Sequence, residues 1–203
     1  MNRNLLDLSL RGMNMNLWLA SASPRRAAML RPLYPSLHQE GLAGVDESPP
    51  IGTVESQVMS ICQRKAAALG TPTGFDAVLV ADTMISDPDD HSLSMGKPAS
   101  KADAAMMLHR LSGRHHQVWT ATGLHWNGRW TFWCEYAVVA FPEFSEEVFS
   151  YLLESESWKG KAGGYDLHGA MGEHARLIEG SESVVLGLAA EALGHLEALA
   201  SVL

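Results

Sequence analysis

Hydrophobic positions along the chain fall into two patterns, short continuous runs typical of buried strands and stripes with the spacing of a helix. The clearest run is Ala77–Ala81, which has the pattern of a strand covered on both faces of its sheet. A shorter run predicts a strand at Leu17–Leu19. Helical spacing and N-cap residues predict helices that, in chain order, cover Pro24–Leu30, Glu55–Leu69, Lys101–Leu111, Glu146–Glu154 and Ala189–Val202.

Segments between these helices predict further strands, and Asn127-Gly128 is typical of a hairpin turn that joins two of them. The strand Ala77–Ala81 is expected to end at Asp82 and Thr83, at the edge where open α/β sheets place their ligands. Strands and helices together predict a mixed α/β fold. The further strands are expected at Ser36–Val45, His116–Leu124, Arg129–Val139, a segment near Ala140-Phe141, Ala175–Ile178 and Ser183–Gly187.

The stretch Leu19–Leu30 combines a strand end, a turn and a helix start. Ser23 stands where an N-cap belongs, and Pro24 suits the first helical position. A helix N-terminus attracts anions, so the adjacent cations Arg25 and Arg26 oppose the helix dipole. A bound phosphate would remove that conflict. An ordinary capped helix with surface arginines fits the same residues equally well.

Charged residues near predicted element ends give a second indication of chemistry. Asp46, Glu47 and Asp82 follow apolar runs, where a carboxylate acts either as a cap or as a ligand for a hard cation such as Mg²⁺. For a single Asp after a strand, the cap is the commoner role. Cations near element ends are each typical of a solvated surface, but as a set they would neutralise a triphosphate. They are Arg25, Arg26, Lys65, Lys97 and Lys161.

Composition excludes several function classes. The chain has 203 residues and a formal net charge of −8, which argues against general binding of nucleic acid or anionic membranes. No apolar run approaches the roughly 18 residues that span a bilayer. The two cysteines lack metal-site spacing, and free thiols predict a cytoplasmic location. We expect residues 1–14 to be an N-terminal extension and residues 15–203 to be a single domain.

Known phosphate-binding and nucleophile motifs are missing from the sequence. It contains no GxxxxGK[ST] loop, no GxGxxG after a strand and no GxSxG. The adjacent pair His115-His116 is a poor metal site, because neighbouring residues on a strand point to opposite faces. The sequence therefore does not predict a P-loop, a Rossmann site or a serine hydrolase.

Eight ordered motifs nevertheless resemble one family, over about residues 17–188. They are LASASPRR at Leu19–Arg26, VDES at Val45–Ser48, RKA at Arg64–Ala66, ADT at Ala81–Thr83, GKP at Gly96–Pro98, the segment Met107–Leu124, KAGGYDLHG at Lys161–Gly169 and IEGSESVVLGL at Ile178–Leu188. In these motifs the chain is similar to the Maf family of nucleoside triphosphate pyrophosphatases.

The resemblance implies a fold and a reaction. The fold would be a long twisted mixed β-sheet between two α/β lobes, similar to that of inosine-triphosphate pyrophosphatases, with the nucleotide in the cleft. The reaction would hydrolyse a nucleoside triphosphate to the monophosphate and pyrophosphate, assisted by a divalent metal cation, Mg²⁺ or Mn²⁺. The family commonly forms homodimers.

The resemblance also implies roles for individual residues. Asp82 would be the proton acceptor that activates water, and it would share the metal with Glu47. Lys65 and Lys97 would act on the phosphates at the reacting centre. The other substrate-binding residues would be Ser21, Ser23, Arg25, Arg26, Thr83, Lys161 and His168.

Three of these positions bear on which base is bound. Arg25 and Thr83 match the members that resemble thymidine- and uridine-triphosphate pyrophosphatases, but His168 stands where those members carry Gln. A neutral His offers one donor and one acceptor in a geometry different from that of an amide. Asp166 adds a negative charge nearby. The pyrimidine subgroup is favoured, and the base preference itself is left open.

A second hypothesis is a nucleotide-binding regulatory protein, acting in division or stress, whose catalysis is vestigial. The presence of Asp82 with Glu47 and the lysines favours the enzyme, because a regulator needs no metal-bound base.

Overall fold

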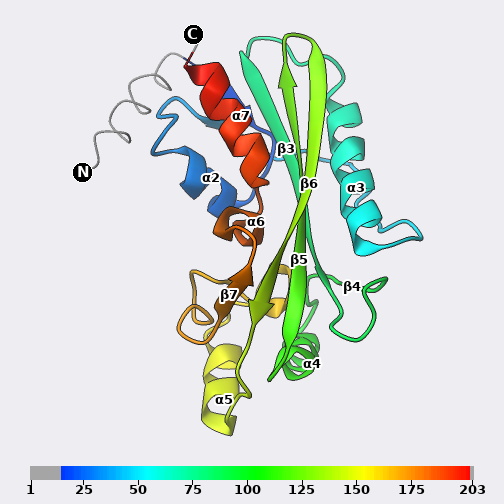
Figure 1. Cartoon of the computed structure of the whole chain (residues 1–203), viewed down its shortest axis with the longest axis vertical. Coiled ribbons are helices and arrows are strands. Elements are labelled where there is room, and N and C mark those ends of the chain that lie inside the picture. Colours follow the sequence, from blue (N-terminus) through cyan, green and yellow to red (C-terminus); the bar gives the residue numbers. More distant parts are fainter. Residues whose placement is uncertain (1–14, 202–203) are drawn as a thin grey trace.

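The computed structural model describes residues 15–201, and the predicted extension at residues 1–14 lies outside them. Within residues 15–201 the strands form one seven-stranded mixed sheet, ordered β2-β1-β3-β5-β6-β7 with β4 paired to β3 (Figure 1). Pairing is parallel among β2, β1 and β3 and antiparallel elsewhere. The strands are β1 (Leu17–Leu19), β2 (His38–Gln39), β3 (Ala77–Ser86), β4 (Ser94–Met95), β5 (His115–Trp126), β6 (Arg129–Ala140) and β7 (Arg176–Glu179).

Several helices begin after a side-chain cap, among them the helix that follows Ser23, the N-cap that the sequence predicts. Ser23, Thr53, Ser100 and Ser145 each accept a hydrogen bond from a backbone N–H in the first turn of the helix that follows. The helices are α2 (Pro24–Leu30), α3 (Val54–Leu69), α4 (Lys101–Leu111), α5 (Glu146–Glu154), α6 (Glu182–Leu186) and α7 (Ala190–Ala200), with a 3₁₀ turn at Ala162–Gly164.

Two lobes share the long hairpin β5–β6. Its turn uses Asn127 (φ 47°) and Gly128 (φ 77°), the pair of positive φ angles that a tight hairpin requires. Figure 1 shows α2 and α7 on one face of the upper part of the sheet and α3 on the other, whereas α4 and α5 lie at the opposite end. The predicted α/β fold with a long mixed sheet is therefore confirmed.

Strand β3 is buried on both faces, as its continuous apolar run predicts. Leu79 and Ala81 pack with the side chains of α2 and α7, and Val78 and Val80 pack with those of α3. Side chains alternate along a strand, so Asp82 faces the α3 side and Thr83 faces the α2 side. This alternation directs Asp82 and Thr83 toward different helices.

Asp82 and Thr83 lie inside β3 and not after its end, which corrects the predicted boundary at Ala81. Strand β3 continues to Ser86 because it pairs with β5 through Ile85. Its other neighbour, β1, stops at Leu19, opposite Leu79. The edge of β3 is therefore left without a strand neighbour at Asp82, at the place where the chain turns from β1 into α2.

Three other strand predictions are wrong. Ser183–Gly187 belongs to helix α6, which Ser181 caps and which ends at Gly187 (φ 111°). A short apolar run cannot by itself distinguish a strand from a buried helical turn. The predicted strand Ser36–Val45 shortens to His38–Gln39, and no separate strand forms at Ala140-Phe141, because β6 itself runs to Ala140.

Candidate active site

A cavity of about 290 Å³ lies beside the open edge of β3. Its walls come from the β1–α2 turn, the middle of β3, Lys65 of α3 and the segment Gly160–Ala162. All the residues that the sequence predicts for the site line this cavity except His168. They are Ser21, Ser23, Arg25, Arg26, Glu47, Lys65, Asp82, Thr83, Lys97 and Lys161.

Lys65 joins the two carboxylates of the cavity. Its Nζ lies 2.7 Å from Asp82 Oδ1 and 3.2 Å from Glu47 Oε1. The side chains of Lys65 and Asp82 are each 10% exposed, whereas that of Glu47 is 50% exposed. Two charges so little exposed need a partner, and each supplies one to the other. The sequence alternative that Asp82 merely caps a strand end is wrong, because the carboxylate lies within β3 and faces Lys65.

The carboxylates of Glu47 and Asp82 fit a hard divalent cation. Magnesium is usually bound by one or two protein carboxylates, with water and substrate phosphate oxygens as the other ligands. Among residues 15–201, no group of three or more His, Cys, Asp or Glu side chains could hold a metal by itself. The donor set therefore suits a cation that shares its ligands with a phosphate substrate.

Glu47 is held in place by Arg64, a residue that the site prediction missed. The Arg64 guanidinium donates to the carbonyl of Asp46 (2.8 Å) and to that of Ser48 (2.9 Å), one on each side of Glu47. It also lies 3.1 Å from the Asp46 carboxylate. The position of Arg64 on α3, one residue before Lys65, was visible in the sequence, but its reach to this loop was not.

Arg26 is a buried cation that has only neutral partners. It donates to Ser21 Oγ (2.9 Å), Thr83 Oγ1 (3.0 Å) and the carbonyl of Gly187 (2.8 Å). Within residues 15–201 its guanidinium forms no salt bridge, and the residue is only 9% exposed. Burial lowers the pKa of Arg26, an effect that the charge of Asp82 partly offsets. The sequence alternative of a surface arginine is therefore wrong for Arg26.

Thr83 connects Arg26 to the rest of the sheet. Its Oγ1 lies 2.9 Å from Thr120 Oγ1 on β5, and Thr120 donates to the carbonyl of Val184 in α6 (2.7 Å). Gly187, at the end of α6, has a positive φ of 111°, and a Cβ there would lie 2.8 Å from Arg26 Nε. Thr120 and Gly187 are supporting residues that the prediction missed, although both fall inside the family motifs.

The two serines of the β1–α2 turn keep their hydroxyl protons available. Ser21 Oγ accepts from Ser23 N–H (3.3 Å) and from Arg26, and Ser23 Oγ accepts from Arg26 N–H (3.5 Å). A hydroxyl carries one donor as well as its acceptor lone pairs. Both serines can therefore donate to a bound phosphate oxygen while they still hold the turn.

The remaining cations that line the cavity are Arg25 of α2, Lys97 and Lys161. Gly163 N–H donates to the carbonyl of Gly96 (3.0 Å), which brings the Lys97 loop beside Lys161. Lys161 Nζ lies 3.3 Å from Asp166 Oδ2, and Arg25 Nη1 lies 3.8 Å from Asp166 Oδ1. Through these two ion pairs, Asp166 links Arg25 to Lys161, which is distant from Arg25 in sequence.

His168 does not line the cavity. Its Nε2 lies 2.5 Å from Glu182 Oε1, and both side chains are more than half exposed. The hypothesis that His168 takes part in reading the base stays a prediction.

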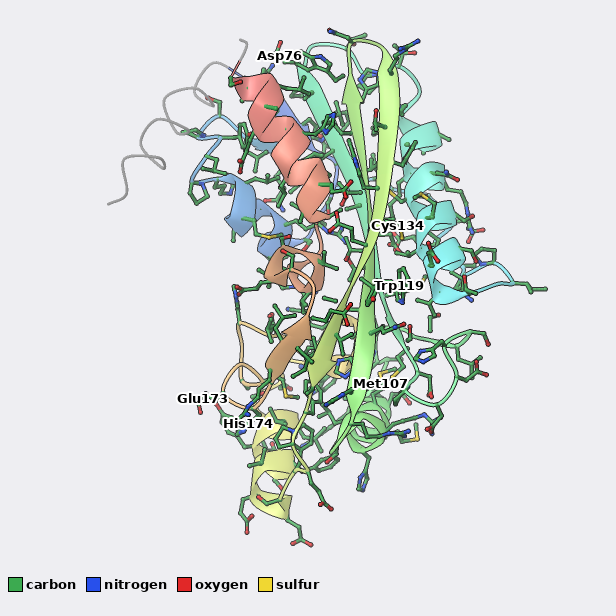
Figure 2. All side chains as sticks on the ribbon, viewed as in Figure 1. Asp76, Met107, Trp119, Cys134, Glu173 and His174 are labelled. Carbon is green, nitrogen blue, oxygen red and sulfur yellow. The ribbon has the colours of Figure 1, made fainter. Side chains whose placement is uncertain are left out.

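Neither cysteine is available as a nucleophile. Burial raises the pKa of Cys62 to about 12, and burial together with Glu55 and Glu135 raises that of Cys134 to about 12. Cys134 lies against α3, where its thiol is 3.9 Å from the carbonyl of Glu55 (Figure 2). Neither Cys62 nor Cys134 is among the residues that line the cavity.

The fold and the cavity define an α/β protein with a cationic cleft that also holds two carboxylates. The chain belongs to the Maf family, since the family model described as Maf-like protein matches residues 16–199. The family resemblance read from the sequence is thereby confirmed.

Curated relatives align over most of this chain. A dTTP/UTP pyrophosphatase of Pyrococcus abyssi is 31% identical over 84% of this chain and 88% of its own length. Enzymes of the same name from Neisseria meningitidis and Syntrophus aciditrophicus are 34% and 36% identical, over 85% and 84% of this chain and 87% and 82% of their own. A solved Ham1 protein of Staphylococcus aureus is similar with a TM-score of 0.47 and 12% identity, over 90% of this chain and 96% of that one.

Proposed function

We propose that this chain is a metal-dependent nucleoside triphosphate pyrophosphatase that releases the monophosphate and pyrophosphate. One observation carries the proposal. The same cavity holds a carboxylate pair bridged by Lys65 and a buried Arg26 whose partners within the described residues 15–201 are all neutral. A polyanion would supply the negative charge that Arg26 lacks as a partner. A hard cation that arrives with it would bind the carboxylates of Glu47 and Asp82. The names of the relatives support the reaction.

Asp82 is the residue that takes a proton from the attacking water. Lys65 holds its carboxylate through a 2.7 Å hydrogen bond, which orients one oxygen and leaves the other to accept. Glu47 and Asp82 would hold the divalent cation, which polarises the phosphorus when bound. Arg26, Lys97 and Lys161 stabilise the charge that spreads over the phosphoryl oxygens as the bond to the leaving pyrophosphate breaks.

Pyrimidine triphosphates are the proposed substrates. Arg25 and Thr83 match the dTTP/UTP subgroup, and both line the cavity. If His168 reads the base, its exchange for the family Gln changes the hydrogen-bonding groups that the base meets, so modified or surplus nucleotides are included in the proposal.

We also propose a cytoplasmic location and a homodimer, on the strength of the free thiols and the family habit. Among the helices of residues 15–201, none is long and apolar enough to span a membrane.

The test is pyrophosphate release from a panel that contains dTTP, UTP, the purine triphosphates and methylated nucleotides, with Mg²⁺, Mn²⁺ or EDTA. Stoichiometric pyrophosphate and monophosphate, lost in EDTA, are the expected result. Release of orthophosphate would contradict the proposed site of attack. Nucleotide binding without any release would favour the regulatory alternative.

A further inference from the structure

Asp166 contacts two of the cations that line the cavity. Its Oδ2 lies 3.3 Å from Lys161 Nζ, and its Oδ1 lies 3.8 Å from Arg25 Nη1. Oδ1 also accepts from the backbone N–H of His168 (3.2 Å), which fixes the carboxylate to its own loop. Asp166 is not itself among the residues that line the cavity. The carboxylate therefore meets Arg25 and Lys161 from outside the space that a ligand would fill.

The three side chains are well shielded from water. Asp166 is 15% exposed, and Arg25 and Lys161 are each 21% exposed. Charges in such positions interact more strongly than charges in open solvent, because less water screens them. A carboxylate and a phosphate offer the same kind of charged oxygen to a guanidinium or an ammonium. Asp166 thus engages the groups that a phosphate would engage.

We propose that Asp166 is an internal counter-ion that sets the affinity of the cavity for polyphosphate. It reduces the net charge of the set Arg25, Lys161 and Asp166 from two positive charges to one, so a triphosphate binds in competition with it. This inference rests on the proposed function, which assigns Lys161 to the phosphoryl oxygens, and it adds Arg25, which lines the same cavity, to the groups that meet the polyphosphate. The same competition weakens binding of the pyrophosphate product and favours its release.

The substitution Asp166→Asn isolates the charge. Asparagine keeps a carbonyl oxygen for the His168 N–H and nearly the same shape, so the loop stays in place while the negative charge is lost. For a single charge several ångströms from the ligand in a partly solvated site, we expect binding to tighten about three- to tenfold. This corresponds to ~0.7–1.4 kcal/mol.

Isothermal titration with inorganic tripolyphosphate, without metal, tests the proposal. Tighter binding by Asp166→Asn at low salt, with a gain that shrinks as ionic strength rises, is the expected result. Asp166→Glu, which keeps the charge, should stay near the wild type. The matched control is Glu154→Gln, which removes a carboxylate paired with Lys101 between α4 and α5. Its affinity should be unchanged.

Equal or weaker binding by Asp166→Asn would overturn the proposal, since it would make Asp166 a residue that positions the cations and does not compete with the ligand. Failure of every variant to bind tripolyphosphate would overturn it as well. Because the titration needs no turnover, a wild-type protein that binds tripolyphosphate but hydrolyses no nucleotide would refute the proposed function and leave this inference standing.

Discussion

Replacement of Arg26 by methionine should abolish tight substrate binding and leave the fold nearly as stable as before. Arg26 is 9% exposed and donates three hydrogen bonds, all of them to neutral oxygens. A cation in such a place serves stability poorly, because burial without a charged partner costs free energy. It serves an incoming phosphate well, because none of its hydrogen-bond partners among residues 15–201 is a carboxylate that must first be displaced.

The magnitudes follow from the contacts of Arg26. Its removal leaves the Gly187 carbonyl without a donor, which costs about 1–3 kcal/mol, whereas Ser21 and Thr83 can rotate toward other partners. Relief of the buried charge returns several kcal/mol. These effects nearly cancel, so the free energy of unfolding should change by less than about 2 kcal/mol, or about 4–8 °C in Tm at most for a chain of this size.

Binding should change far more than stability. Loss of one partner from a buried charge pair costs about 2–5 kcal/mol, which is ~30-fold or more in Kd. The assay pairs thermal unfolding with titration of a non-hydrolysable nucleoside triphosphate. Arg31→Met is the matched control, because Arg31 follows the same helix and its side chain, among residues 15–201, bonds only Gln39 on the surface. Loss of more than about 4 kcal/mol of stability with unchanged affinity would refute the reasoning and make Arg26 a structural residue.

Three further predictions use other parts of the site. Gly187→Ala should destabilise the protein by about 1–3 kcal/mol and lower its activity, because the backbone has φ 111° and the new Cβ would lie 2.8 Å from Arg26 Nε. Chemical denaturation measures the loss of stability, and turnover measures the loss of activity. His168→Gln should raise turnover of dTTP and UTP if His168 reads the base, and an unchanged substrate profile would place it outside the base pocket. Cys62, whose pKa burial raises to about 12, should react with a disulfide reagent at pH 8 only after unfolding, since the native thiolate fraction is very small. Fast labelling of the folded protein would contradict that burial.

Local signals predicted much of the fold. Ser23, Thr53, Ser100 and Ser145 each precede a helix, because an N-cap acts within one turn and needs no distant partner. The Asn127-Gly128 turn is local in the same sense. Long-range pairing accounts for the wrong boundary of β3. This strand extends past Asp82 because β5 lies beside it, and no feature of residues 77–86 alone shows that.

The candidate site divides in the same way. Motifs predicted the charged and hydroxyl residues that line the cavity. They do not show whether an arginine is buried, because Gly187, whose carbonyl accepts from Arg26, lies 161 positions away. The contacts of Arg64 with the Glu47 loop and of Asp166 with Arg25 likewise depend on how distant segments pack. Residue identity was predictable, and the contacts between distant residues were not.

The account depends most directly on Asp82 as the proton acceptor. The decisive measurement is kcat for pyrophosphate release from saturating UTP with Mg²⁺, for wild type, Asp82→Asn and the control Asp76→Asn. Asp76 lies just before β3, at the upper end of the molecule (Figure 2), is not among the residues that line the cavity, and accepts from Asn16 N–H. A positioned base contributes about 10²–10⁴-fold, so Asp82→Asn should lose at least ~100-fold in kcat while its nucleotide Kd changes little. An Asp82→Asn protein that retains more than about a hundredth of the wild-type rate, with Asp76→Asn fully active, would contradict the central claim.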